Sequence, residues 1–152
     1  MAYSDFKLSE IIQKFELTLN EVSGLFADVP EEEPSNLLTT ILKENVDLAV
    51  SINTQKARSE MIISPILLEV RRKLNNEISL FSGVDFNDAI KIVYSAVTIG
   101  TIWQFLKLED KTISIDLTEY YIKDMKKILG ILISAIMLST HKQLINNNPV
   151  NP

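Results

Sequence analysis

The first half of the chain repeats apolar residues at three- and four-residue spacing, which predicts helices that bury one face. The pattern covers residues 6–19, 35–53 and 54–75. Ser35 stands where an N-cap of the second helix is expected. Pro65 lies inside the third pattern and lacks a backbone donor. We therefore expect either a kink there or a new helix that begins with the preceding serine as its cap.

The pattern then changes to runs of β-branched and aromatic residues, which predict strands. These runs are residues 78–86, 90–99, 102–108 and 112–115. Turn residues separate them, and such short connections favour neighbouring antiparallel strands. A last helical pattern runs to about Gln143, with Asp116 and Thr118 as its expected N-caps.

This order of elements predicts an α+β domain in which helices pack on a mostly antiparallel sheet of about four strands. A length of 152 residues is typical of one domain, which we place at residues 1–145. Residues 146–152 offer little to bury, so we expect a disordered tail.

The composition excludes several kinds of functional site. The chain has no cysteine, which excludes disulfides, thiolate zinc sites and thiol nucleophiles. No phosphate-binding glycine motif or zinc-hydrolase motif occurs. Residues 128–138 form the most apolar stretch, which is too short to cross a membrane. We therefore expect a cytoplasmic protein without a membrane partner.

The net charge of −5 is unevenly distributed. Residues 1–55 carry three lysines against ten acids, and the remainder carries twelve basic residues against ten acids. Because nucleic-acid binding depends on neutralising phosphates, a DNA or RNA site would need a local basic patch in the second part. Arg58, Arg71, Arg72 and Lys73 are the candidates. Cations that close a helix are also common without any ligand.

Glu60 is a candidate metal ligand because it lies at the margin of the apolar stripe of the third helix. A buried carboxylate must be paired or bind a metal. The alternative is an exposed Glu60 that pairs with Lys56 one turn earlier.

Two further acids and a lysine are candidates for catalysis. Glu109 and Lys111 form a Glu-x-Lys triplet, which in nucleases places a metal-binding carboxylate and a charge-stabilising ammonium on one strand face. The alternative is the solvated turn of a hairpin. Asp85 lies near the end of a predicted strand, where it faces either a site or water.

Two blocks of the sequence resemble an uncharacterised bacterial family, frequent in cyanobacteria, that has the restriction-endonuclease-like PD-(D/E)xK fold. The first block includes Lys56-Ala57-Arg58-Ser59-Glu60 and Ile78-Ser79-Leu80-Phe81-Ser82-Gly83, within residues 44–87. The second includes Phe105-Leu106-Lys107-Leu108 and Glu119-Tyr120-Tyr121-Ile122, within residues 94–132. Together the blocks cover nearly the whole chain.

The resemblance implies a nuclease fold without its catalytic centre. Between the two blocks the family has a strand that ends in a Cys-Asp-Phe-like motif, a strand with Glu-Ala-Lys and a helix, and none of these has a counterpart here. Of the family's metal-site positions, only Glu60 has a match. A two-carboxylate Mg²⁺ site with a lysine cannot be supplied by one glutamate.

We therefore expect a noncatalytic, internally shortened relative that needs no cofactor. It would associate with itself, as a homo-oligomer, or with an intact relative, because lost elements leave sheet edges to cover. The alternative is a Mg²⁺-dependent DNA nuclease with a site rebuilt from Glu60, Asp85, Glu109 and Lys111.

Overall fold

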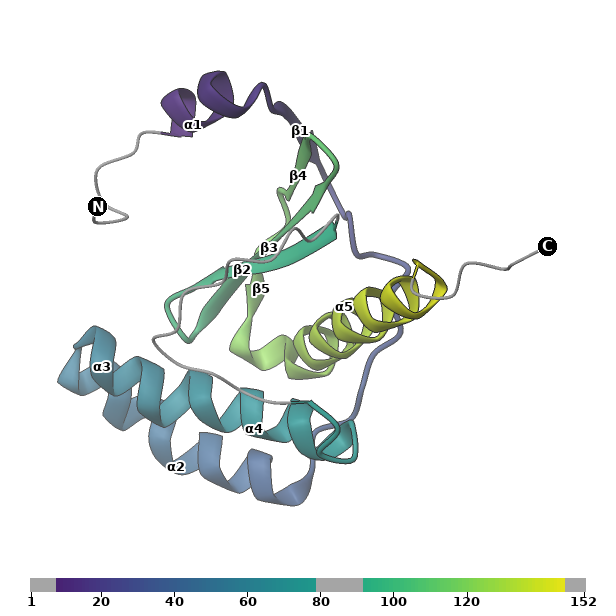
Figure 1. The fold of residues 1–152 in the computed structure, drawn as a ribbon. Helices are drawn as coiled ribbons and strands as arrows, with labels where there is room; N and C mark the ends of the chain where they lie inside the picture. The colour runs from purple at the N-terminus through teal and green to yellow at the C-terminus, as the bar shows by residue number, and fades with distance from the viewer. Residues whose placement is uncertain (1–7, 79–91, 147–152) are drawn as a thin grey trace.

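The computed structural model describes residues 8–78 and 92–146, whose arrangement is shown in Figure 1. In chain order the elements are α1 (Leu8–Phe15), β1 (Thr18–Val22), α2 (Asn36–Ile52), α3 (Gln55–Arg58), the π-helical segment η2 (Ser59–Ile63), α4 (Ser64–Lys73), β2 (Ile92–Thr98), β3 (Ile102–Glu109), β4 (Thr112–Asp116), β5 (Tyr120–Tyr121), the 3-10 turn η3 (Ile122–Asp124) and α5 (Met125–Asn146). The predicted α+β class is confirmed.

The strands form one open, mixed sheet in the order β1-β4-β3-β2, with β5 also paired to β3. The pairs β2–β3 and β3–β4 are antiparallel, as the short connections predicted. The pair β3–β5, which the sequence did not predict, is antiparallel too. The pair β1–β4 is parallel, and Leu19 lies opposite Ile113. The prediction of a helix through residue 19 was therefore wrong. That helix ends at Phe15, and Glu16 follows with a positive φ of 52°.

Helix α2 begins and ends where its sequence predicts. The Ser35 hydroxyl accepts a hydrogen bond from the Leu38 backbone N–H, which satisfies a donor that the first turn leaves free. At the other end Asn53 adopts the left-handed conformation, with a φ of 55°. The Ser35 cap is thus confirmed.

Helices α3, η2 and α4 form one continuous composite helix, in which Pro65 is accommodated without a break. The π-helical segment η2 lies directly before Pro65, and the backbone N–H of Ser64 bonds to the Ser59 carbonyl. Proline has no N–H for the Met61 carbonyl four residues earlier. Instead, the side-chain amide of Asn45 donates to that carbonyl at 3.1 Å.

The last helix begins later than the sequence predicted. Residues 120–121 form β5, and α5 starts at Met125 after η3. Asp116 was expected to cap this helix, but its carboxylate instead accepts from Gly24, Thr118 and Tyr120. That prediction was therefore wrong. The predicted strand 78–86 and the tail lie almost entirely outside the described residues.

The helices α2, α4 and α5 lie on one side of the sheet, as Figure 1 shows. The hydrophobic core lies between these helices and the sheet. Trp103 and Phe105 project from β3 into this core and are almost fully buried. They meet Ile62 and Ile66 of the composite helix and Ile128 of α5 within the same cluster. Burial of these side chains supplies most of the driving force for folding.

Residues 23–34 form a strap that runs from β1 past α5 to the start of α2 (Figure 1). The backbone N–H of Glu32 donates to the Lys126 carbonyl at 2.9 Å, and the Lys127 ammonium donates to the Ala27 carbonyl. Gly130 lets the strap approach: a Cβ at this position would lie 2.0 Å from the Pro30 carbonyl oxygen. The strap therefore joins the sheet to both helical layers.

Candidate functional site

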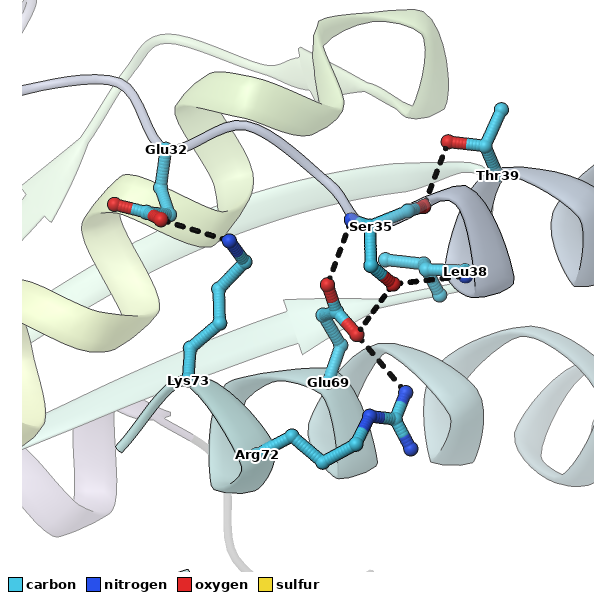
Figure 2. A network of polar contacts seen from close by, with 7 residues as sticks. All are labelled: Glu32, Ser35, Leu38, Thr39, Glu69, Arg72 and Lys73. Carbon is cyan, nitrogen blue, oxygen red and sulfur yellow. Dashed lines mark hydrogen bonds and ion pairs between the residues drawn. The ribbon is translucent and has the colours of Figure 1, made fainter. Parts of the chain in front are cut away.

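Glu69 of α4 carries the most buried carboxylate on the helical layer, with a relative exposure of 1%. Its oxygens accept from the Ser35 backbone N–H at 2.8 Å, from the Ser35 hydroxyl at 3.0 Å and from the Arg72 guanidinium at 2.9 Å (Figure 2). Ser35 therefore caps α2 and bonds to α4 at once. The Glu69 network fixes the first turn of α2 against the middle of α4.

The hydrogen bonds determine the charge state of Glu69. Burial raises the pKa of this carboxyl, but the hydrogen bonds from Ser35 and Arg72 outweigh the burial, so the pKa lies below its ordinary value. Glu69 is thus a carboxylate at neutral pH. All its partners are donors, which leaves it poorly suited to accept a proton from a substrate.

Asp116 is the second buried acid in the described part of the chain, with no exposed surface. It accepts from the backbone N–H groups of Gly24 at 3.1 Å and Thr118 at 3.0 Å, and from the Tyr120 hydroxyl at 2.9 Å. Although burial raises the pKa of Asp116, the hydrogen bonds from Thr118 and Tyr120 lower it below its ordinary value. Burial and then the bond to Asp116 raise the pKa of the Tyr120 hydroxyl.

Both buried acids therefore act as connectors between segments that are distant in sequence. Glu69 joins α4 to the start of α2, and Asp116 joins the end of β4 to the strap. Every buried side-chain nitrogen or oxygen in the described residues has a hydrogen-bond partner. Neither carboxylate therefore has an oxygen without a hydrogen-bond partner that would indicate a missing ligand.

Glu60, the predicted metal ligand, lies on the surface. Its side chain is 65% exposed and faces the Lys56 ammonium at 3.8 Å, one helical turn away. This is the alternative that the sequence left open. Glu60 lines an open hollow together with Arg58 and Thr98.

Glu109 and Lys111 lie at the β3–β4 turn, with Asp110 between them at a positive φ of 52°. The Glu109 carboxylate pairs with Lys107 at 2.6 Å, and Lys111 pairs with Glu16 at 2.9 Å. The hairpin-turn interpretation of this triplet is confirmed.

The structure does not bring Glu60 and Glu109 together. Glu60 lies in the hollow beside Thr98, at the end of the sheet where β3 begins, whereas Glu109 ends β3. An eight-residue strand spans about 23 Å, which is far beyond the reach of one shared cation. Asp85 lies outside the described residues. Within the described ranges, no group of three acids or histidines could hold a metal ion.

The four candidate phosphate ligands are each engaged within the protein. Arg58 donates to Asn53 and the Ile99 carbonyl, and Arg71 donates to Asn76 and the Ile78 carbonyl. Arg72 pairs with Glu69, and Lys73 pairs with Glu32 at 2.8 Å (Figure 2). These cations therefore connect elements of the fold.

An apolar cleft of about 270 Å³ lies between the β2–β3 pair and α5. Phe26, Phe105, Ile131 and Ile136 are among its lining residues, and none of the lining residues is charged. Such a lining offers no ligand for a metal ion or a phosphate. Among the described helices, none has both the length and the apolar character required of a membrane span.

The sequence reasoning did not single out Glu69 as a buried acid, although a signal was present. Glu69 lies on the same helical stripe as the buried residues Ile66 and Val70, three residues before Arg72. An acid on a buried stripe beside an arginine at i+3 is typical of a paired carboxylate. Asp116 lacked such a signal, because its partner Gly24 is 92 residues away.

Comparison with known proteins gave no match: no family model, no curated protein and no solved structure is similar to this chain.

Proposed function

We propose that this chain is a noncatalytic, internally shortened relative of PD-(D/E)xK nucleases that acts as an association module. Its partner is a second copy or an intact relative, in the cytoplasm, and it uses no cofactor. The resemblance of its two sequence blocks gives the proposed ancestry. Function depends on the site and not on the fold, so the placement of the described acids is the observation that supports a module over a nuclease.

One observation carries the noncatalytic part of the proposal: the two candidate acids in the described residues, Glu60 and Glu109, lie far apart, and each is paired with a lysine. Glu60 and Glu109 lie about a strand length apart, and each faces a lysine. The carboxylates of the two buried acids, Glu69 and Asp116, accept hydrogen bonds from donors of the protein itself. Two-carboxylate metal catalysis needs its ligands around one ion.

The test is a cleavage assay of plasmid and single-stranded DNA with Mg²⁺ or Mn²⁺, together with calorimetric titration of Mg²⁺. We expect no cleavage and no stoichiometric binding of the ion. The Glu60→Ala variant is the control. Cleavage by the natural chain that is lost in Glu60→Ala would replace this proposal with the rebuilt nuclease site of Glu60, Asp85, Glu109 and Lys111.

A gel-retardation assay at low salt tests nucleic-acid binding without cleavage. We expect no binding, because Arg58, Arg71, Arg72 and Lys73 already have partners within the fold. Retardation that weakens steeply with salt would instead assign these cations to phosphates.

A further inference from the structure

The outer face of the sheet, turned away from the helices, is apolar where an exposed face is expected to be polar. Strand alternation and the register place the following residues on it: Leu19, Glu21, Val93, Ser95, Val97, Ile102, Gln104, Leu106, Leu108, Ile113, Ile115 and Tyr121. Nine of these twelve are aliphatic or aromatic. A solvated face of an antiparallel sheet normally carries polar residues at these positions.

The outer face is not part of the hydrophobic core of the described residues. The core cluster and the apolar residues packed against it include none of its members. Val97 is 61% exposed and Tyr121 43% exposed, at the margins of the face. Leu19 and Val93 are exposed as well, whereas Ile102, Leu106, Leu108, Ile113 and Ile115 at the centre are half-buried. Apolar surface on the solvent side of a sheet is typical of an interaction site.

We infer that the outer face binds the same face of a second copy of this chain. This inference names the partner in the association role proposed above and rests on that proposal. The charge pattern favours a copy over a nucleic acid or a charged surface, because Glu21 is the one charged side chain among the twelve. A self-complementary interface is isologous, with a two-fold axis between the copies.

The order of the strands keeps the Glu21 carboxylates of the two copies apart in such a dimer. Two sheets stacked face to face lie about 10 Å apart with nearly aligned strands. A two-fold axis parallel to the strands places β1 of one copy over β2 of its partner, since these are opposite edges of the order β1-β4-β3-β2. The two Glu21 carboxylates then lie at opposite margins, and β3 and β4 meet in the centre.

The size of the face sets the expected strength. Four strands about 4.8 Å apart and up to eight residues long give a footprint on the order of 400 Å². Two such faces bury about 800 Å², less than the roughly 1,200 Å² of stable complexes. The dimer is therefore expected to be weak and to form only at high protein concentration.

Sedimentation velocity of the full chain from 1 µM to 1 mM tests this inference. We expect the mass to rise from the 17.2 kDa of one chain towards twice that value. The variant Val97→Lys, which adds a charge to the face at an already exposed position, should raise the Kd at least tenfold. Leu48→Lys is the matched control, because Leu48 is 51% exposed on α2, away from the sheet, and should leave the Kd unchanged.

Cross-linking gives a second, independent measurement, since the natural chain has no cysteine. Leu106→Cys lies at the centre of the face, and a short bismaleimide should join two copies; Leu48→Cys should give no specific product. Fluorescence of the single tryptophan, Trp103, checks that each variant is folded. A chain that stays monomeric up to 1 mM would overturn the inference. A segment of the same chain would then be the better candidate to cover the outer face. An assembly that Val97→Lys leaves intact would also overturn it.

The outcome is separable from that of the cleavage assay. A monomer without nuclease activity would refute the second copy as partner and leave the noncatalytic proposal standing. A dimer that cleaves DNA would refute the proposed function while supporting the interface.

Discussion

Replacement of Glu69 by glutamine tests whether the buried carboxylate stabilises the fold. The glutamine keeps the size of the side chain but substitutes an NH₂ group for one acceptor oxygen. Three donors point at Glu69, two from Ser35 and one from Arg72. One of these bonds is therefore lost in Glu69→Gln, and the others lose the contribution of the negative charge.

The magnitude follows from the burial of the network. A hydrogen bond to a charged group contributes about 1.5–3 kcal/mol. Arg72 is 41% exposed, so water solvates its guanidinium when the carboxylate is gone. We therefore expect Glu69→Gln to lower the free energy of unfolding by about 2–3 kcal/mol, below the 3–5 kcal/mol of a fully buried broken pair.

The matched control is Glu60→Gln, on the same composite helix. Glu60 also faces a cation, but its side chain is 65% exposed and that of Lys56 is 82% exposed. An exposed pair of this kind contributes about 0–1 kcal/mol. Urea unfolding followed by Trp103 fluorescence measures both variants. With a urea dependence of about 2 kcal/mol per molar, the midpoint should fall by about 1–1.5 M for Glu69→Gln and by less than about 0.5 M for Glu60→Gln.

Equal midpoint shifts for the two variants would refute the reasoning, because burial would then have no influence on the strength of a carboxylate–cation pair. If the urea midpoint falls strongly in Glu69→Gln but hardly changes in Ser35→Ala, the bond from Arg72 alone stabilises the carboxylate. The Ser35→Ala variant also removes the cap of α2, which costs about 1 kcal/mol by itself.

The same carboxylates predict a pH dependence of stability. The pKa values of Glu69 and Asp116 lie below their ordinary values of 4.5 and 3.8. Between the folded and unfolded pKa values the unfolded chain binds more protons, so stability rises with pH there. The contribution is complete above about pH 5 and is lost as the pH falls through the folded pKa values. Urea midpoints should stay nearly constant from pH 6 to about pH 5 and then fall towards pH 3, less steeply in Glu69→Gln.

Two backbone contacts give further predictions, each measured by urea unfolding. Gly130→Ala should destabilise the protein by about 1–3 kcal/mol, because its Cβ would lie 2.0 Å from the Pro30 carbonyl. An alanine in a helix interior ordinarily stabilises by about 1 kcal/mol, so stabilisation would refute this close contact. Asn45→Ala should cost about 1–2 kcal/mol, because it leaves the Met61 carbonyl without its donor. The cost should shrink in a Pro65→Ala background, which restores a backbone N–H; an unchanged cost would contradict this account.

Local sequence signals predicted the elements whose stability is local. Ser35 and Asn53 delimit α2 because caps act within one turn. The strands β2, β3 and β4 follow from their β-branched runs and short turns. Pro65 was recognised as an interruption, but its accommodation depends on Asn45, twenty positions earlier on another helix.

The features that the sequence did not predict depend on long-range pairing. Strand β1 has five residues and an exposed surface, so it lacks the apolar alternation that marks a strand. It exists because Thr18–Val22 can pair in parallel with β4, about ninety residues away. Asp116 was interpreted as a helix cap for the same reason. Its true partners lie on the strap and on β5, which only the folded chain brings together.

The uneven charge of the sequence is explained by contacts inside the fold. Three acids of the N-terminal segment pair with lysines of the more basic remainder: Glu16 with Lys111, Glu32 with Lys73 and Glu33 with Lys126. The second and third of these pairs hold the strap on α4 and α5. Each partly exposed pair is weak alone, but together they orient the strap over Gly130.

This use of charge also bears on function. A lysine that anchors the strap would have to release its acid before it could bind a phosphate, and that exchange reduces the gain from neutralising the phosphate. Among the candidate phosphate ligands, Lys73 is in this position with respect to Glu32, and Arg72 with respect to Glu69. The outer face of the sheet, by contrast, has apolar side chains that lie outside the core of the described residues. Association through that face costs no existing ion pair, which is why we place the interaction surface there and not on the basic residues.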